Sequence, residues 1–185
     1  MDMLRCVVSE TIENNFPEFD ITFVFENEFF NDTYLIESDV KSSNVFKNVK
    51  YNIEIKTTKE LDSDEEVKKF TEKLVDFVRN NNLERKVIIQ SFDPRALKIV
   101  KEIDSNIKTS FLIRDKVDDN IISQSKILRV NIISPDYSLL TKEIVENIHK
   151  NGFEVLPWTV NDVDSFLKLI NYHQIHFHIH LYHLF

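Results

Sequence analysis

The chain has 185 residues, a length that suits one domain, and a formal net charge of −8 at pH 7. This acidic balance and the lack of a basic cluster argue against nucleic acid as a partner. Cys6 is the single cysteine, which excludes a disulfide within the chain, and no apolar run is long enough for a transmembrane segment.

The first clear element covers residues 51–57, where apolar and polar side chains alternate. With the two-residue period of a strand, the apolar side chains share one face, and the opposite face carries Glu54 and Lys56. Two interpretations are open. The polar face looks into water, as in an ordinary half-exposed strand, or it points into the interior of a larger sheet.

Helix and strand patterns alternate through the rest of the chain. Ser63 and Glu66 form a capping box before a helical apolar stripe, and Asp93 before Pro94 is typical of a helix start. Gly152 suits the left-handed residue that closes a helix. Further strands are predicted at 87–92, 109–113, 128–133 and 153–160, with a weak helix before 127 and a last helix over 163–170.

Strands that alternate with helices predict parallel strands and the α/β class. A dinucleotide-binding open sheet needs a glycine-rich turn, but Gly152 is the single glycine. A (β/α)8 barrel, the TIM barrel, is therefore the better prediction, and in it the polar face of the 51–57 strand would point into the lumen. A complete barrel needs about 250 residues, so we expect an incomplete one.

Three segments in a fixed order resemble a known family. They read NIEIK at 52–56, QSFD at 90–93 and PWTVN at 157–161. The stretch 134–141, followed by His149, is less specific. Over residues 51–170 the chain resembles the glycerophosphodiester phosphodiesterase family, as a truncated or degraded copy. A phosphoinositide phospholipase or a sphingomyelinase-type barrel is the runner-up, and residues 54–56 with 158–161 favour the first family.

The resemblance implies an enzyme that hydrolyses glycerophosphodiesters to an alcohol and glycerol phosphate. The expected partner is therefore this small-molecule substrate. The family uses a divalent cation, Ca²⁺ or Mg²⁺. Glu54 would then be a metal ligand, Lys56 would face the substrate phosphate, and Trp158 would form a wall of the substrate pocket. A hard cation prefers such oxygen ligands. The alternative for Trp158 is a core side chain whose indole nitrogen is satisfied.

The resemblance is weaker over residues 1–50, a divergent part of a single barrel domain that covers residues 1–185. Arg5 lies where the family has a His-Arg-Gly strand end, and its implied role is substrate binding. Glu37 and Asp39 resemble the family's Glu-x-Asp strand and would share one face, as metal ligands. The alternative is that both acids are solvated in a loop. No signal peptide is visible, so the chain as written is expected to be cytoplasmic.

The expected catalytic histidine pair is absent, because the chain has no histidine before His149. In the family, two histidines act as general acid and base. We therefore expect little or no phosphodiesterase activity from this chain. Two classes of function stay open: a phosphodiesterase whose sequence is damaged, and a non-catalytic barrel remnant that binds a phosphorylated ligand or a protein partner.

Residues 173–185 form a divergent tail rich in histidine. His176, His178 and His180 alternate with apolar residues, so as a strand they would present one imidazole face. Such a face could bind zinc or nickel, although a tail without selected function explains it more simply. His149 is most simply a surface residue. The sequence does not indicate an oligomeric state.

Overall fold

The computed structural model describes residues 22–25, 50–57, 63–160 and 162–172. Six strands form one parallel sheet in chain order, and the five described helices alternate with them from β2 onward. The strands are β1 (Thr22–Phe25), β2 (Lys50–Glu54), β3 (Val87–Ser91), β4 (Lys108–Ile113), β5 (Ile132–Pro135) and β6 (Glu154–Val155). The helices are α3 (Asp64–Asn80), α4 (Pro94–Ile103), α5 (Asp119–Leu128), α6 (Lys142–Lys150) and α7 (Val163–Ile170), and a 3-10 turn, η3, covers Tyr137–Leu139.

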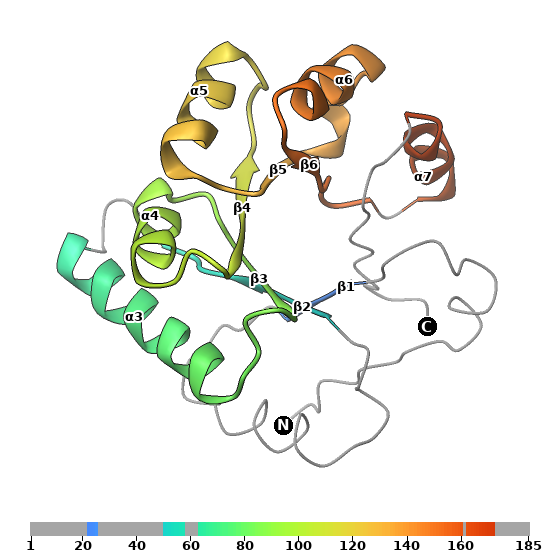
Figure 1. Ribbon diagram of the computed structural model, residues 1–185. Coiled ribbons are helices and arrows are strands. Elements are labelled where there is room, and N and C mark those ends of the chain that lie inside the picture. The colour runs from blue at the N-terminus through green and yellow to red at the C-terminus, as the bar shows by residue number, and fades with distance from the viewer. Residues whose placement is uncertain (1–21, 26–49, 58–62, 161, 173–185) are drawn as a thin grey trace.

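One α-helix comes after each strand from β2 to β6. The helices α3 to α7 lie outside the sheet and are arranged in chain order around the strands (Figure 1). Neighbouring strands are all paired in parallel, and none is skipped. The predicted α/β class is confirmed. Within the described residues, no helix combines the length and apolar character needed to cross a bilayer.

The predicted helix ends are confirmed by their capping contacts. Ser63 and Glu66 exchange the two hydrogen bonds of a capping box at the start of α3. Asp93 caps α4, with proline at its first position. At the end of α6, Gly152 has φ +87°, a backbone conformation that glycine adopts without strain. These local signals explain why the helix boundaries could be predicted.

Two predicted strands need correction. The strand expected over 128–133 begins only at Ile132, because Leu128 ends α5 and Arg129 adopts a left-handed conformation with φ 56°. The strand expected over 153–160 is limited to Glu154–Val155. Backbone hydrogen bonds to the β5 segment continue past this short strand, from the Leu156 N–H to the Ile133 carbonyl and from the Trp158 N–H to the Pro135 carbonyl. Trp158 pairs with Asp136 as an isolated parallel bridge.

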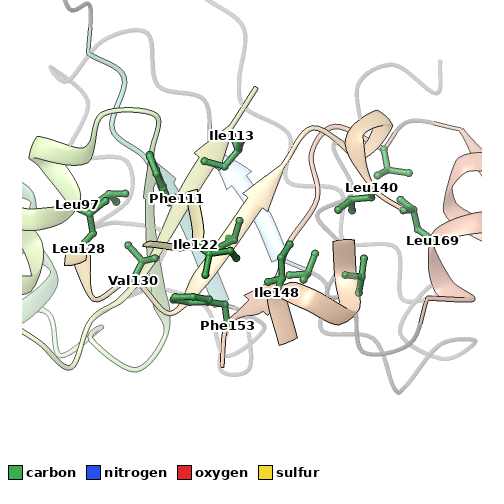
Figure 2. Packing of buried hydrophobic residues seen from close by; sticks show 14 residues of the cluster. Leu97, Phe111, Ile113, Ile122, Leu128, Val130, Leu140, Ile148, Phe153 and Leu169 are labelled. Atoms are coloured by element: carbon green, nitrogen blue, oxygen red, sulfur yellow. The ribbon is translucent and has the colours of Figure 1, made fainter. Parts of the chain in front are cut away.

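The apolar core lies between the strands and the helices, in two clusters. One contains residues of β2 and β3 with α3 and α4, and the other contains residues of β4, β5 and β6 with α5 and α6. Figure 2 shows the second cluster, with Phe111 and Ile113 of β4 beside Ile122 and with Leu140 near Leu169. Ile127, on the other side of α5, is 79% exposed.

The packing distinguishes a helix-facing side of the sheet from the opposite side. Tyr51 and Ile55 pack in the helix-facing core, together with Val87 and Ile89 of β3. Since side chains alternate along a strand, Asn52, Glu54 and Gln90 point to the opposite face, which we call the inner face. The predicted lumenal orientation of the polar face of β2 therefore agrees with the packing.

Candidate functional site

A row of polar side chains crosses three strands on the inner face. Glu54 of β2 is in register with Gln90 of β3, and Gln90 is in register with Ser110 of β4. Gln90 and Ser110 are buried, and Glu54 at the carboxyl end of its strand is half-buried. Parallel barrels place their functional groups at this edge. The row therefore leads from the interior to the edge where a site is expected.

On the same inner face, a buried amide pair joins β2 to β3. Asn52 Nδ2 donates a hydrogen bond to Gln90 Oε1 at 2.7 Å, and both side chains are almost fully buried. Because a buried amide is costly without a partner, this bond fixes both side chains in one orientation. The pair, which we call the polar floor, thus places two fixed amides on the face of the sheet that carries Glu54.

The segment after β2 is tied to the segment after β3. Ser91 Oγ donates to the Ile55 carbonyl at 2.7 Å, and Thr57 Oγ1 donates to Asp93 Oδ2 at 2.8 Å. Lys56, between these two anchored residues, is exposed at the strand end. The predicted strand 51–57 is therefore too long, since β2 ends at Glu54 and Lys56 lies beyond it.

The Asp93 carboxylate accepts most of the side-chain hydrogen bonds at this edge. Arg95 donates to its carboxylate through Nε, at 3.0 and 3.1 Å, and through Nη2, at 2.7 Å, and Arg95 also reaches Asp64 at the start of α3. Burial alone would raise the pKa of Asp93, but the hydrogen bonds from Arg95 and Thr57 outweigh burial and hold that pKa below its usual value. Asp93 therefore stays ionised and holds the edge together.

Trp158 lies where the chain leaves β6, and its indole ring is held from two sides. Its Nε1 donates to the Ser134 carbonyl at 2.9 Å, and the ring meets Phe92 edge to face at 5.3 Å between centroids. The side chain is only half-buried. It thus combines a satisfied indole nitrogen, the alternative weighed for it, with the partial exposure that a pocket wall needs.

Arg114, directly after β4, lies over the ring of Phe92. Its guanidinium carbon is 4.8 Å from the centroid of the Phe92 ring, and the side chain is exposed. Residues that follow β2, β3, β4 and β6 are thereby collected at one edge of the sheet. We call Lys56, Phe92, Arg114 and Trp158, with Glu54 below them, the strand-end site.

The strand-end site supplies part of a metal centre. The Glu54 carboxylate is the hard oxygen donor that Ca²⁺ or Mg²⁺ prefers. Among the described residues, no three histidine, cysteine or acidic side chains lie close enough together to hold an ion. The other predicted ligands, Glu37 and Asp39, and the predicted substrate residue Arg5 lie outside the described residues. Glu54 therefore fits a hard cation as one ligand of a larger set.

Phe92 and Arg114 of the strand-end site, and Gln90 beside it, had no assigned role in the sequence. Gln90 was part of a quoted motif, and a polar side chain in the apolar run 87–92 is a signal that it faces the interior. Arg114 directly follows the predicted strand 109–113, but only the structure places it on Phe92. His149, expected at the surface, is half-buried on α6.

Comparison with known proteins agrees with this geometry. The model of the glycerophosphoryl diester phosphodiesterase family matches residues 6–175. The chain belongs to this family. A glycerophosphodiester phosphodiesterase of Caldanaerobacter subterraneus is 31% identical over 101 residues, which cover 54% of this chain and 40% of that protein.

Solved structures of similar fold include a glycerophosphodiester phosphodiesterase from Parabacteroides distasonis, with a TM-score of 0.65 and 19% identity over 80% of this chain and 58% of that one. A phosphodiesterase from Oleispira antarctica, solved with the product sn-glycerol-3-phosphate, has a TM-score of 0.61 and 19% identity over 71% of this chain and 51% of that one. The predicted incomplete TIM barrel is thus confirmed. The chain covers less than two thirds of each of these relatives.

Proposed function

We propose that this protein acts on glycerophosphodiesters at the strand-end site, with Ca²⁺ or Mg²⁺ held in part by Glu54. The observation that carries the proposal is the position of Glu54, which is half-buried at the carboxyl end of β2 on the inner face, in register with Gln90 of the Asn52–Gln90 floor. Membership of the phosphodiesterase family supports it. The family reaction, hydrolysis to an alcohol and glycerol phosphate, is proposed for the protein as a whole.

Each side chain of the site has a proposed role. Glu54, with Glu37 and Asp39, supplies carboxylate oxygens for the cation, which when bound polarises the phosphoryl oxygens. Lys56 and Arg5 neutralise the phosphate of the substrate. Trp158 forms an apolar wall against the glycerol or the alcohol part of the substrate.

The 185-residue chain itself is proposed to bind with little or no turnover. It has no histidine before His149, so the histidine pair that the resemblance implies is absent. Without the histidine that acts as general acid in the family, the leaving alkoxide lacks that proton donor. Non-catalytic binding of a phosphorylated ligand, the second candidate function, is favoured for the chain alone by this absence.

Calorimetric titration with glycerol phosphate in the presence of Mg²⁺ or Ca²⁺ tests the proposed site. The wild-type chain is expected to bind glycerol phosphate only with the cation present. Glu54→Gln should lose this cation-dependent binding. Glu65→Gln, at an exposed position of α3, is the matched control. Equal binding by Glu54→Gln and the wild type would overturn the proposed role of Glu54.

A turnover assay separates the two candidate functions. With glycerophosphocholine and either cation, the chain is expected to release no more choline than Glu54→Ala does. Cation-dependent release well above that variant would show that the chain is an active phosphodiesterase and would overturn the proposal of binding without turnover.

A further inference from the structure

Arg114 has no role in the binding of the phosphoryl group proposed above, yet it is held at the same edge. It follows β4 directly and its guanidinium lies over the Phe92 ring, 4.8 Å from the centroid. Stacking on an aromatic face restricts the rotation of a long side chain, so less entropy is lost when a ligand binds it. Arg114 is therefore an oriented cation rather than a freely moving one.

The aromatic support of Arg114 is itself anchored. Phe92 meets Trp158 edge to face, with an interplanar angle of 89°, and the Trp158 indole is fixed by its bond to the Ser134 carbonyl. A ligand that lies against the Trp158 wall thus comes within reach of the guanidinium across a single ring. The geometry links the proposed wall of the pocket to a positive charge.

No carboxylate of the described residues forms a salt bridge with Arg114. Asp115, the next residue, is exposed and forms no ion pair with Arg114 among the described residues, while Asp118 pairs with Lys116 at 2.7 Å and Asp136 accepts two hydrogen bonds from Ser138. The guanidinium fork, which suits a carboxylate or phosphate in two parallel bonds, is thus not used within this part of the chain.

We propose that Arg114 is a specificity-determining residue that binds an anionic group on the alcohol part of a glycerophosphodiester. The inference rests on the proposed function, in which Lys56 serves the phosphodiester itself. The guanidinium of Arg114, a second positive side chain of the strand-end site, then pairs with a second negative group of the substrate. This group is a carboxylate or a phosphate on the alcohol part. Alcohols that carry a quaternary ammonium group, such as choline, are disfavoured because they meet a like charge.

Three glycerophosphoryl esters of similar size test this inference by calorimetry on the full chain with Mg²⁺: those of glycolate, ethanol and choline. The wild type is expected to bind the glycolate ester about fivefold more tightly than the ethanol ester, as expected for an exposed but oriented ion pair. The choline ester should bind most weakly. Raised salt should reduce the preference.

Arg114→Gln is expected to abolish the preference for glycolate and to leave the affinity for the ethanol ester within about twofold of wild type. Phe92→Leu removes the aromatic support and should reduce the preference in part. Arg85→Gln, at an exposed position before β3, is the matched control. Thermal unfolding of each variant verifies that it is folded.

The outcomes separate the two proposals. Binding of all three esters with equal affinity would overturn the role of Arg114 and leave the proposed function intact. If a folded Arg114→Gln variant lost affinity equally for all three esters, Arg114 would bind the phosphodiester that they share. This result would also overturn the inference. Binding of none of them by the wild type would overturn both proposals.

Discussion

The side-chain amide of Asn52 donates a 2.7 Å hydrogen bond to the side-chain oxygen of Gln90, and this bond connects β2 to β3 on the inner face of the sheet. Both residues are almost fully buried, at 0% and 3% exposure. A polar pair in this position costs free energy unless its bonds are made, so it specifies one arrangement of the two strands.

Substitution of Gln90 tests that connection. Gln90→Leu is expected to lower the free energy of unfolding by about 1 to 3 kcal/mol, because the Asn52 amide loses its acceptor in a buried position. Urea unfolding followed by circular dichroism measures the change. Gln124→Leu, at an exposed position of α5, should leave stability nearly unchanged.

The double variant Asn52→Leu with Gln90→Leu should lose less than the sum of the two single variants, since it removes donor and acceptor together. Strict additivity, or a Gln90→Leu variant as stable as the wild type, would show that the bond does not hold the two strands together.

Asp93→Asn tests how much the ionised Asp93 carboxylate stabilises the strand-end edge. The lowered pKa of Asp93 means that its ionised form is favoured by folding, so its contribution is fully present above the ordinary value of 3.8 and is lost as the pH falls through the lower folded-state pKa. Near neutral pH, Asp93→Asn should therefore lose about 1.5 to 3 kcal/mol of stability.

Urea unfolding at a series of pH values measures this difference, which should shrink toward zero under strongly acidic conditions. Asp76→Asn, at an exposed position of α3, is the control. A difference that grows as the pH falls would contradict the sign of the predicted linkage.

Lys101 of α4 stabilises the opposite edge of the sheet. Its ammonium donates to the carbonyls of Ser105 and Ile107, at 3.2 and 2.7 Å, and to Asn131 Oδ1 at 2.8 Å. Burial, and next the charge of Arg129, lower the pKa of Lys101. Lys101→Met should cost about 1 to 3 kcal/mol, because three acceptors lose their shared donor.

Thermal or urea unfolding measures the effect, and Lys98→Met, exposed on the same helix, is the matched control. Equal stability of the two variants would indicate that water replaces the ammonium at this edge and that Lys101 has no structural role.

Trp158 provides a direct optical probe of the proposed site, because it is the single tryptophan of the chain. Addition of glycerol phosphate with Mg²⁺ is expected to change its fluorescence in a saturable manner, since the half-buried ring would exchange water for ligand. Glu54→Gln should abolish the change, whereas Glu65→Gln should retain it. A saturable change of equal affinity in both variants would place the ligand away from the Glu54 carboxylate.

Much of the fold is encoded locally and was predicted for that reason. The capping box at Ser63, the Asp93–Pro94 helix start and Gly152 act within a few residues, so their effect is visible in sequence alone. The failures occurred where local pattern is ambiguous. Residues 128–133 read as an apolar strand, yet Arg129 in a left-handed conformation closes α5 and delays β5 to Ile132.

The sequence by itself determined the parallel α/β class, the family and the inward orientation of Glu54, because alternation and short motifs depend on neighbours in the chain. Only the tertiary structure decided which distant side chains meet: Asn52 with Gln90, Thr57 with Asp93, and Phe92 with both Arg114 and Trp158. These contacts depend on strand register and on the exact ends of strands, and a shift of one residue would send each side chain to the other face of the sheet.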